Sequence, residues 1–127
     1  MHLNPPASLL TIARPRLHDL DLSHNQLNSI TSVDSLPSLS ALNISYNQLI
    51  EIETTTPLPS LQSLKLSNNV LRTLDVGAFP SLNLLYVDQN CLSSVSGLEQ
   101  CRYLEVFSAR AQMSNGVNRG FSMSIWV

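Results

Sequence analysis

The chain has 127 residues, a formal net charge of −2 and only 13% charged residues, which suits a single domain. Lysine occurs once, as Lys65, and no basic stripe is present, so binding to nucleic acid through its phosphates lacks the usual electrostatic source. No apolar run approaches the roughly 20 residues that a membrane-spanning helix needs, so we expect no membrane span.

Residues 1–16 carry no repeated pattern, and their apolar residues Leu9, Leu10 and Ile12 lie between prolines. The first residues have neither the charged start nor the long apolar stretch of a secretory signal. An open stack of repeats exposes its terminal core residues and needs a cover. We therefore expect this segment to be a flank or a degenerate cap.

From residue 17 the phrase LxxLxLxxNxL recurs, with offsets of 22, 22 and 21 residues between copies. A fifth copy departs from the phrase, because Gln112 stands where the asparagine is expected. A phrase of this kind with a period of roughly 20–29 residues is typical of leucine-rich repeats. The predicted repeats span residues 17–112 and start at residues 17, 39, 61, 82 and 104.

Alternating leucines such as Leu20 and Leu22 point to one face of a short strand, and strands of successive repeats then pair side by side. Between strands the apolar positions advance in steps of three, from Leu27 through Ile30 to Val33, which suits 3₁₀ turns better than an α-helix. The predicted fold is α/β, a leucine-rich-repeat solenoid shaped as a horseshoe arc. It has a parallel β-sheet on the concave face and 3₁₀ or irregular turns on the convex face.

The asparagine of each phrase stands where the chain turns inward and leaves backbone groups without strand partners. Its side chain offers one acceptor group and two donors, so a column of asparagines satisfies the turns from inside. A buried amide without a partner would cost roughly 1–3 kcal/mol, so we interpret this column as structural. The predicted ladder consists of Asn25, Asn47, Asn69 and Asn90, and we expect it to end at Gln112.

A 22-residue unit with such turns on its convex side resembles the short leucine-rich repeats of intracellular proteins, the class of the regulatory subunit of protein phosphatase 1. The resemblance covers residues 17–112. It implies binding of another protein along the concave sheet, no enzymatic activity, and a cytoplasmic location with a nuclear one as the alternative. A role as the regulatory subunit of a phosphatase stays open as an alternative function.

Cys91 and Cys101 lie in a single repeat, whereas secreted repeat proteins usually close their ends with clusters of cysteines. A reducing compartment is therefore favoured. The glycosylation sequon Asn43-Ile44-Ser45 supports another interpretation, in which the chain is an extracellular recognition or receptor fragment.

Strand positions that face away from the core predict where a partner binds. In the last two repeats these positions are apolar or aromatic beside charged side chains, which folding alone does not explain. Five strands about 4.8 Å apart make a face about 20 Å across, which fits a peptide, a helix or the surface of a small protein. We expect a monomer. The predicted partner-binding residues are Leu84, Tyr86, Asp88, Val106, Arg110, Lys65 and Tyr46.

The most enzyme-like cluster is His18, Asp19, Asp21 and His24, but its histidines lie toward opposite ends of one strand, roughly 20 Å apart. Metal ligands must converge to about 2 Å from the ion, so no metal site is predicted. Cys91 has no histidine near it in the pattern, and no serine motif or phosphate loop is present. We expect no catalytic residue and no cofactor.

The fifth repeat, residues 104–112, is similar to repeats of the fungal spindle-pole-body scaffold of the septation-initiation and mitotic-exit networks, which is related to centriolin. This resemblance implies a scaffold or adaptor in cell-cycle and cytokinesis signalling at the spindle pole body or centrosome. It also implies a small GTPase module or a kinase coactivator as the partner, with Tyr86 and Arg110 facing it.

Residues 113–127 hold two turn signals and then alternate apolar with polar residues, which predicts a half-buried strand. We expect a truncated cap or the start of a further repeat, and a chain that is a fragment of a longer protein.

Overall fold

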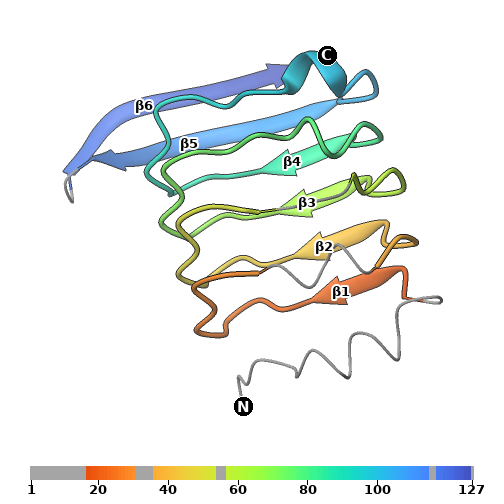
Figure 1. The fold of residues 1–127 in the computed structure, drawn as a ribbon. Helices are drawn as coiled ribbons and strands as arrows, with labels where there is room; N and C mark the ends of the chain where they lie inside the picture. Colours follow the sequence, from red (N-terminus) through yellow and green to blue (C-terminus); the bar gives the residue numbers. More distant parts are fainter. Residues whose placement is uncertain (1–16, 31–35, 54–56, 115–116, 127) are drawn as a thin grey trace.

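The computed structural model describes residues 17–30, 36–53, 57–114 and 117–126. Its strands form one six-stranded sheet in chain order (Figure 1). The first five strands are parallel, and the sixth runs antiparallel to the fifth, so the predicted solenoid with a parallel sheet is confirmed. The strands are β1 (Asp19–Asp21), β2 (Ala41–Asn43), β3 (Ser63–Lys65), β4 (Leu84–Tyr86), β5 (Val106–Ser114) and β6 (Val117–Trp126).

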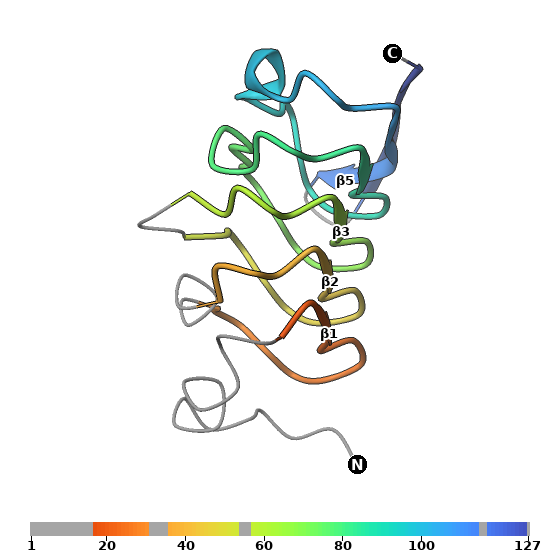
Figure 2. The same cartoon turned by 90° about the vertical axis from the view of Figure 1, so that its right-hand side faces the viewer.

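Each of the first four repeats forms one coil, with its strand on one side of the stack and the described part of its return path on the other (Figure 2). The back of the fourth repeat contains a 3₁₀ helix, η2 (Leu98–Gln100), and the described residues contain no α-helix. The apolar steps of three therefore follow turns and a 3₁₀ helix. The flank expected at residues 1–16, the step at Val33 and the turn residues 115–116 lie outside the described residues.

One residue at the same register position of each parallel strand points into the core, and in β1 to β4 it is the middle residue. Fully burying one such side chain contributes roughly 1.5–3 kcal/mol, and no coil buries its own without a neighbour above and below. At the first coil the side chain is half-buried, whereas in the next four it is at most 4% exposed. The strand register aligns this column as Leu20, Leu42, Leu64, Leu85 and Phe107.

A four-residue turn leads toward each of the strands β2 to β5. Its first carbonyl accepts a hydrogen bond from the N–H of its fourth residue, at N–O distances between 3.1 and 3.3 Å. In three of the four turns the middle residues are proline and serine. Proline suits the second position of a turn because its φ is already fixed near −65°. The turns are residues 36–39, 58–61, 79–82 and 101–104.

The asparagine column satisfies backbone groups of neighbouring coils. The side-chain oxygen of Asn47 accepts the N–H of Leu27 at 3.0 Å, and its nitrogen donates to the carbonyl of Leu22 at 2.9 Å. Asn69 and Asn90 repeat both bonds one and two coils further on. Each side chain thus joins its own turn to the coil before it.

Gln112 continues this column, which corrects the expectation that the ladder ends there. Its Oε1 accepts the N–H of Leu92 at 2.9 Å, and its Nε2 donates to the carbonyl of Val87 at 2.9 Å. The strand pairing is irregular between Arg110 and Gln112, so the backbone follows a different path from the earlier coils. The extra methylene of glutamine lets the side chain reach the same two groups from that path.

The residue before each ladder side chain has a left-handed backbone, with φ between 54° and 61°. This conformation is uncommon outside glycine, and in the described residues every such non-glycine position lies in this one column. The ladder hydrogen bonds hold the tight turn that requires it. The five residues are His24, Tyr46, Asn68, Gln89 and Ala111.

β5 is the longest of the parallel strands, with nine residues against three in each earlier strand. It continues past Gln112 and pairs with β6 from Val106 opposite Trp126 to Ser114 opposite Val117 (Figure 1). An uncovered strand edge is a template for pairing with another chain. β6 covers that edge of β5.

Candidate functional site

The exposed face of the sheet carries an apolar pair where β4 and β5 meet. Leu84 lies beside Val106 in the strand register, and both side chains are half-buried. Tyr86 lies beside the exposed Lys65 of β3. Parallel strands about 4.8 Å apart bring such neighbours into side-chain contact range. The structure therefore brings four of the predicted residues together, and we call Leu84, Tyr86, Val106 and Lys65 the sheet-face patch.

Asp88 is engaged within the fold. Its Oδ1 accepts the Ser108 hydroxyl at 2.7 Å and the backbone N–H of Arg110 at 2.7 Å, while its own N–H donates to the Ser67 hydroxyl at 3.1 Å. The first two bonds tie the turn after β4 to β5, and the third ties it to the turn after β3. Asp88 thus positions the backbone of Arg110, whose exposed side chain lies next to the patch along β5.

Tyr46 lies away from the patch. It is one of the left-handed residues in the turns after the strands. In the repeat that carries Tyr86 the equivalent residue is Gln89, two coils further on. Its ring stacks on that of His24, with centroids 4.3 Å apart and planes inclined by 10°. Half of its surface stays exposed. Tyr46 and the sheet-face patch are therefore separate features.

The first coils give the sheet face an acidic end. A hollow of about 330 Å³ lies over β1 to β3, with Asp19 and Asp21 at one side and Lys65 at the other. The Ser23 hydroxyl at 2.6 Å, and then the Ser23 N–H at 2.9 Å, lower the pKa of Asp21 below its ordinary value. Asp21 therefore stays ionised at neutral pH, and the face runs from acidic at β1 to apolar at β4 and β5.

The histidines and aspartates of the first coil do not form a metal centre. His18 Nδ1 lies 3.0 Å from the carbonyl of Ser38, and His24 stacks on Tyr46. In the described ranges no group of three or more metal-ligating side chains converges. None of the described helical segments combines the length and the apolar character needed to cross a membrane.

The two cysteines are free thiols in different surroundings. Cys101 is buried, and its Sγ lies 3.5 Å from the carbonyls of Val76 and Phe79. Burial raises the pKa of the Cys101 thiol, and the nearby charge of Glu99 raises it further. Cys91 is half-buried. The buried thiol of Cys101 is thus kept protonated.

We expect iodoacetamide to alkylate Cys91 well before Cys101 in the folded chain at about pH 8, because the thiolate is the reactive form. Peptide mapping by mass spectrometry over time would give the two rates. In urea both sites should react at similar rates. Equal rates in the folded chain would contradict the protected position of Cys101.

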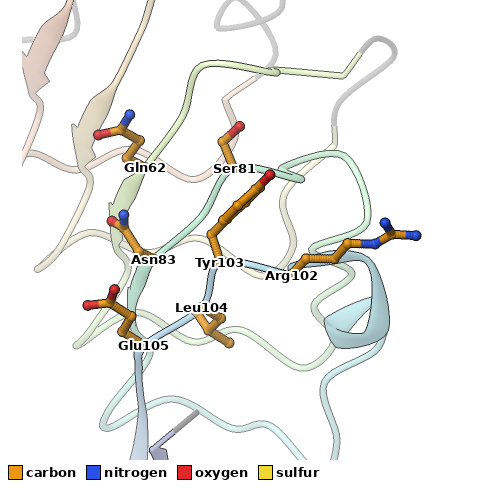
Figure 3. A pocket seen from close by; sticks show the side chains of 7 residues that line it. All are labelled: Gln62, Ser81, Asn83, Arg102, Tyr103, Leu104 and Glu105. Atoms are coloured by element: carbon orange, nitrogen blue, oxygen red, sulfur yellow. The ribbon is translucent and has the colours of Figure 1, made fainter.

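A second surface, which the sequence analysis missed, lies where the strands begin. The middle residues of the turn are Pro37-Ser38, Pro59-Ser60 and Pro80-Ser81 in three coils, but Arg102-Tyr103 in the fifth. Tyr103 is 68% exposed, the highest value among the large apolar side chains described. The break in the proline–serine column was visible in the sequence, and it marks a groove beside this turn (Figure 3).

Comparison with protein families agrees with the coil geometry. One family model, described as leucine rich repeat, matches residues 12–49, and a second leucine rich repeat model matches residues 60–82. Both matched stretches are thus similar to leucine-rich repeats, and the structure has the solenoid fold expected of such repeats. A search of curated proteins found no match.

Proposed function

We propose that this chain is a non-enzymatic protein-interaction module that binds a peptide, a helix or a small protein surface on the exposed face of its sheet. Leucine-rich repeat domains are typically interaction modules, which supports the class. The observation that carries the site is the neighbouring pair Leu84 and Val106, which stays half-exposed although the core lies directly beneath. Tyrosine and arginine beside such a pair are favoured anchors in interfaces.

The charges on this face give the partner an orientation. Asp19 and Asp21 lie three strands away from Leu84, so a ligand across the sheet meets acidic groups about 14 Å from the apolar pair. A helix covers that distance in about ten residues at 1.5 Å per residue. A short amphipathic helix with a basic end therefore matches the face better than a wholly apolar one does.

The narrower roles are proposals that rest on resemblance. A scaffold or adaptor in cytokinesis signalling, with a small GTPase module or a kinase coactivator as partner, follows from the similarity of the fifth repeat. A phosphatase as partner follows from the short repeat class. Both would use the same face, so identifying the bound protein decides between them. A cytoplasmic location and a monomeric state are likewise proposed.

The test replaces Leu84, Tyr86 and Arg110 together by alanine. A partner captured with the full chain, identified by mass spectrometry and purified, should lose at least about a hundredfold in affinity, since truncated anchors often cost over 1 kcal/mol each. Calorimetric titration would measure the affinity, and circular dichroism should show a thermal transition close to that of the parent chain.

A matched control replaces Ile50, Val70 and Arg72 by alanine. This set also combines two large side chains with one arginine, here two aliphatic residues, and all three are exposed but lie outside the strands of the sheet. The control variant should keep the affinity of the parent. Equal affinity for both triple variants would show that the partner does not bind the sheet-face patch.

A further inference from the structure

A groove of about 610 Å³ lies at the rim where β3, β4 and β5 begin, apart from the exposed face of the sheet. Gln62, Asn83 and Glu105 form a column along one side of it (Figure 3). The ring of Tyr103 rises opposite this column toward Ser81, and Arg102 points away from it (Figure 3). The groove is therefore an aromatic wall that faces a column of polar side chains.

The backbone along this rim is already satisfied. The carbonyl of Gln62 accepts the N–H groups of Asn83 and Leu84 at 2.9 and 3.0 Å, and the carbonyl of Asn83 accepts those of Glu105 and Val106 at 2.9 and 3.0 Å. A ligand strand cannot add to this backbone by pairing. In the described part of the chain, no hydrogen bond reaches the side-chain amides of Gln62 and Asn83, so these amides remain to bind a ligand.

Folding does not account for Tyr103. It occupies the third position of the turn 101–104, where the other turns have Ser38, Ser60 and Ser81, and the turn hydrogen bond is the same in all four. Its neighbour Leu104 is buried beneath it and supplies the core contact. A large ring held in solvent at a rigid turn is a preformed face on which a ligand can pack.

The spacing of the side chains of Gln62, Asn83 and Glu105 favours one backbone conformation for a bound peptide. Coils lie about 4.8 Å apart, so Gln62 and Glu105 are about 9.6 Å apart along the stack. One turn of polyproline II helix is three residues at 3.1 Å, or about 9.3 Å, which places equivalent residues over both side chains. An extended strand repeats the same face every 6.6 Å or so, which does not match this interval.

Polyproline II also has the right free groups, because it forms no internal hydrogen bonds and its carbonyls remain open acceptors. The amides of Gln62 and Asn83 are donors along the column, and Tyr103 offers the aromatic face against which proline rings pack. Glu105 is exposed and places a carboxylate at the end of the column. A basic ligand residue complements it.

We propose that this groove binds a proline-rich segment of a partner protein in the polyproline II conformation, with a basic residue of the segment beside Glu105. Proline packs on Tyr103, and ligand carbonyls accept hydrogen bonds from Gln62 and Asn83. The groove binds independently of the sheet-face patch, so this inference does not rest on the proposed function.

The test uses the full chain and a fluorescein-labelled oligoproline peptide with lysine at one end, followed by anisotropy. We expect saturable binding whose affinity falls by about tenfold or more in Tyr103→Ser. Serine is the matched replacement, because three other turns already carry it at this position. Gln62→Ala with Asn83→Ala should weaken it similarly. Tyr86→Ala, on the sheet-face patch, should leave the affinity within about twofold.

Two exchanges test the assigned conformation and charge. A peptide with glycine in place of proline should bind at least tenfold or so more weakly, because it is not held in polyproline II. A peptide with glutamate in place of lysine should bind poorly to the parent and regain affinity with Glu105→Lys. No saturable binding at millimolar peptide, unchanged affinity in Tyr103→Ser, or equal affinity of the glycine peptide would each overturn the proposal.

Discussion

Replacing Gly97 by alanine is expected to lower the free energy of unfolding by about 2–5 kcal/mol. Gly97 precedes η2 and has a φ of +83°, where a side chain costs roughly 1–2 kcal/mol. An added Cβ would also lie 2.4 Å from Asp75 Oδ1 and 2.4 Å from the backbone nitrogen of Gly77. The second contact involves backbone, so relieving it requires two coils to move apart, at a further cost of roughly 1–3 kcal/mol.

The neighbouring Gly77 supplies the matched control. A Cβ there would lie 3.1 Å from Asp75 Oδ1 and 3.1 Å from Gln100 Oε1, which are both ends of side chains that can shift. Gly77→Ala should therefore change the free energy of unfolding by less than about 1 kcal/mol. Urea unfolding followed by circular dichroism would compare the two. Similar losses in both variants would refute the assigned backbone clash.

The fold followed from the sequence because each coil repeats the same local rule. A period of two at the strand and an asparagine at the turn are readable one residue at a time, and the described strands and ladder bonds lie at those positions. The role of Gln112 was not readable. Its hydrogen bonds depend on the path of β5, and that path depends on the pairing with β6.

The candidate sites divide in the same way. Alternation along the strands was enough to place Leu84, Tyr86 and Val106 on one face, because register follows from the repeat. Asp88 was predicted to bind a partner, and its bonds to Ser108 and Arg110 within the fold were not foreseen, because they cross between coils and leave no mark in the pattern. The groove at Tyr103 was missed for another reason. Its mark in the sequence is the change from proline–serine to Arg102-Tyr103 in one turn, and the strand pattern does not include that position.

Replacing Asn69 by leucine is expected to lower the free energy of unfolding by about 1–3 kcal/mol. The loss is concentrated on one group. The two carbonyls to which Asn69 donates still accept a hydrogen bond after the change. Asn47 also donates to the carbonyl of Ile44, and Asn90 also donates to that of Leu66. The buried N–H of Leu49, which bonds to Asn69 Oδ1 at 3.0 Å, is left without an acceptor.

Asn25→Leu is the matched control, because it is the same change at the first position of the same column. Asn25 Oδ1 is buried and accepts no hydrogen bond from the described residues, so removing it leaves none of their N–H groups without an acceptor. The Leu22 carbonyl keeps its bond from Asn47 at 2.9 Å. Asn25→Leu should therefore cost about 1–3 kcal/mol less than Asn69→Leu in urea unfolding.

Hydrogen exchange should show faster exchange of the Leu49 amide in Asn69→Leu alone. Equal losses with no change at Leu49 would mean that the ladder stabilises the coils by packing and that its hydrogen bonds contribute little.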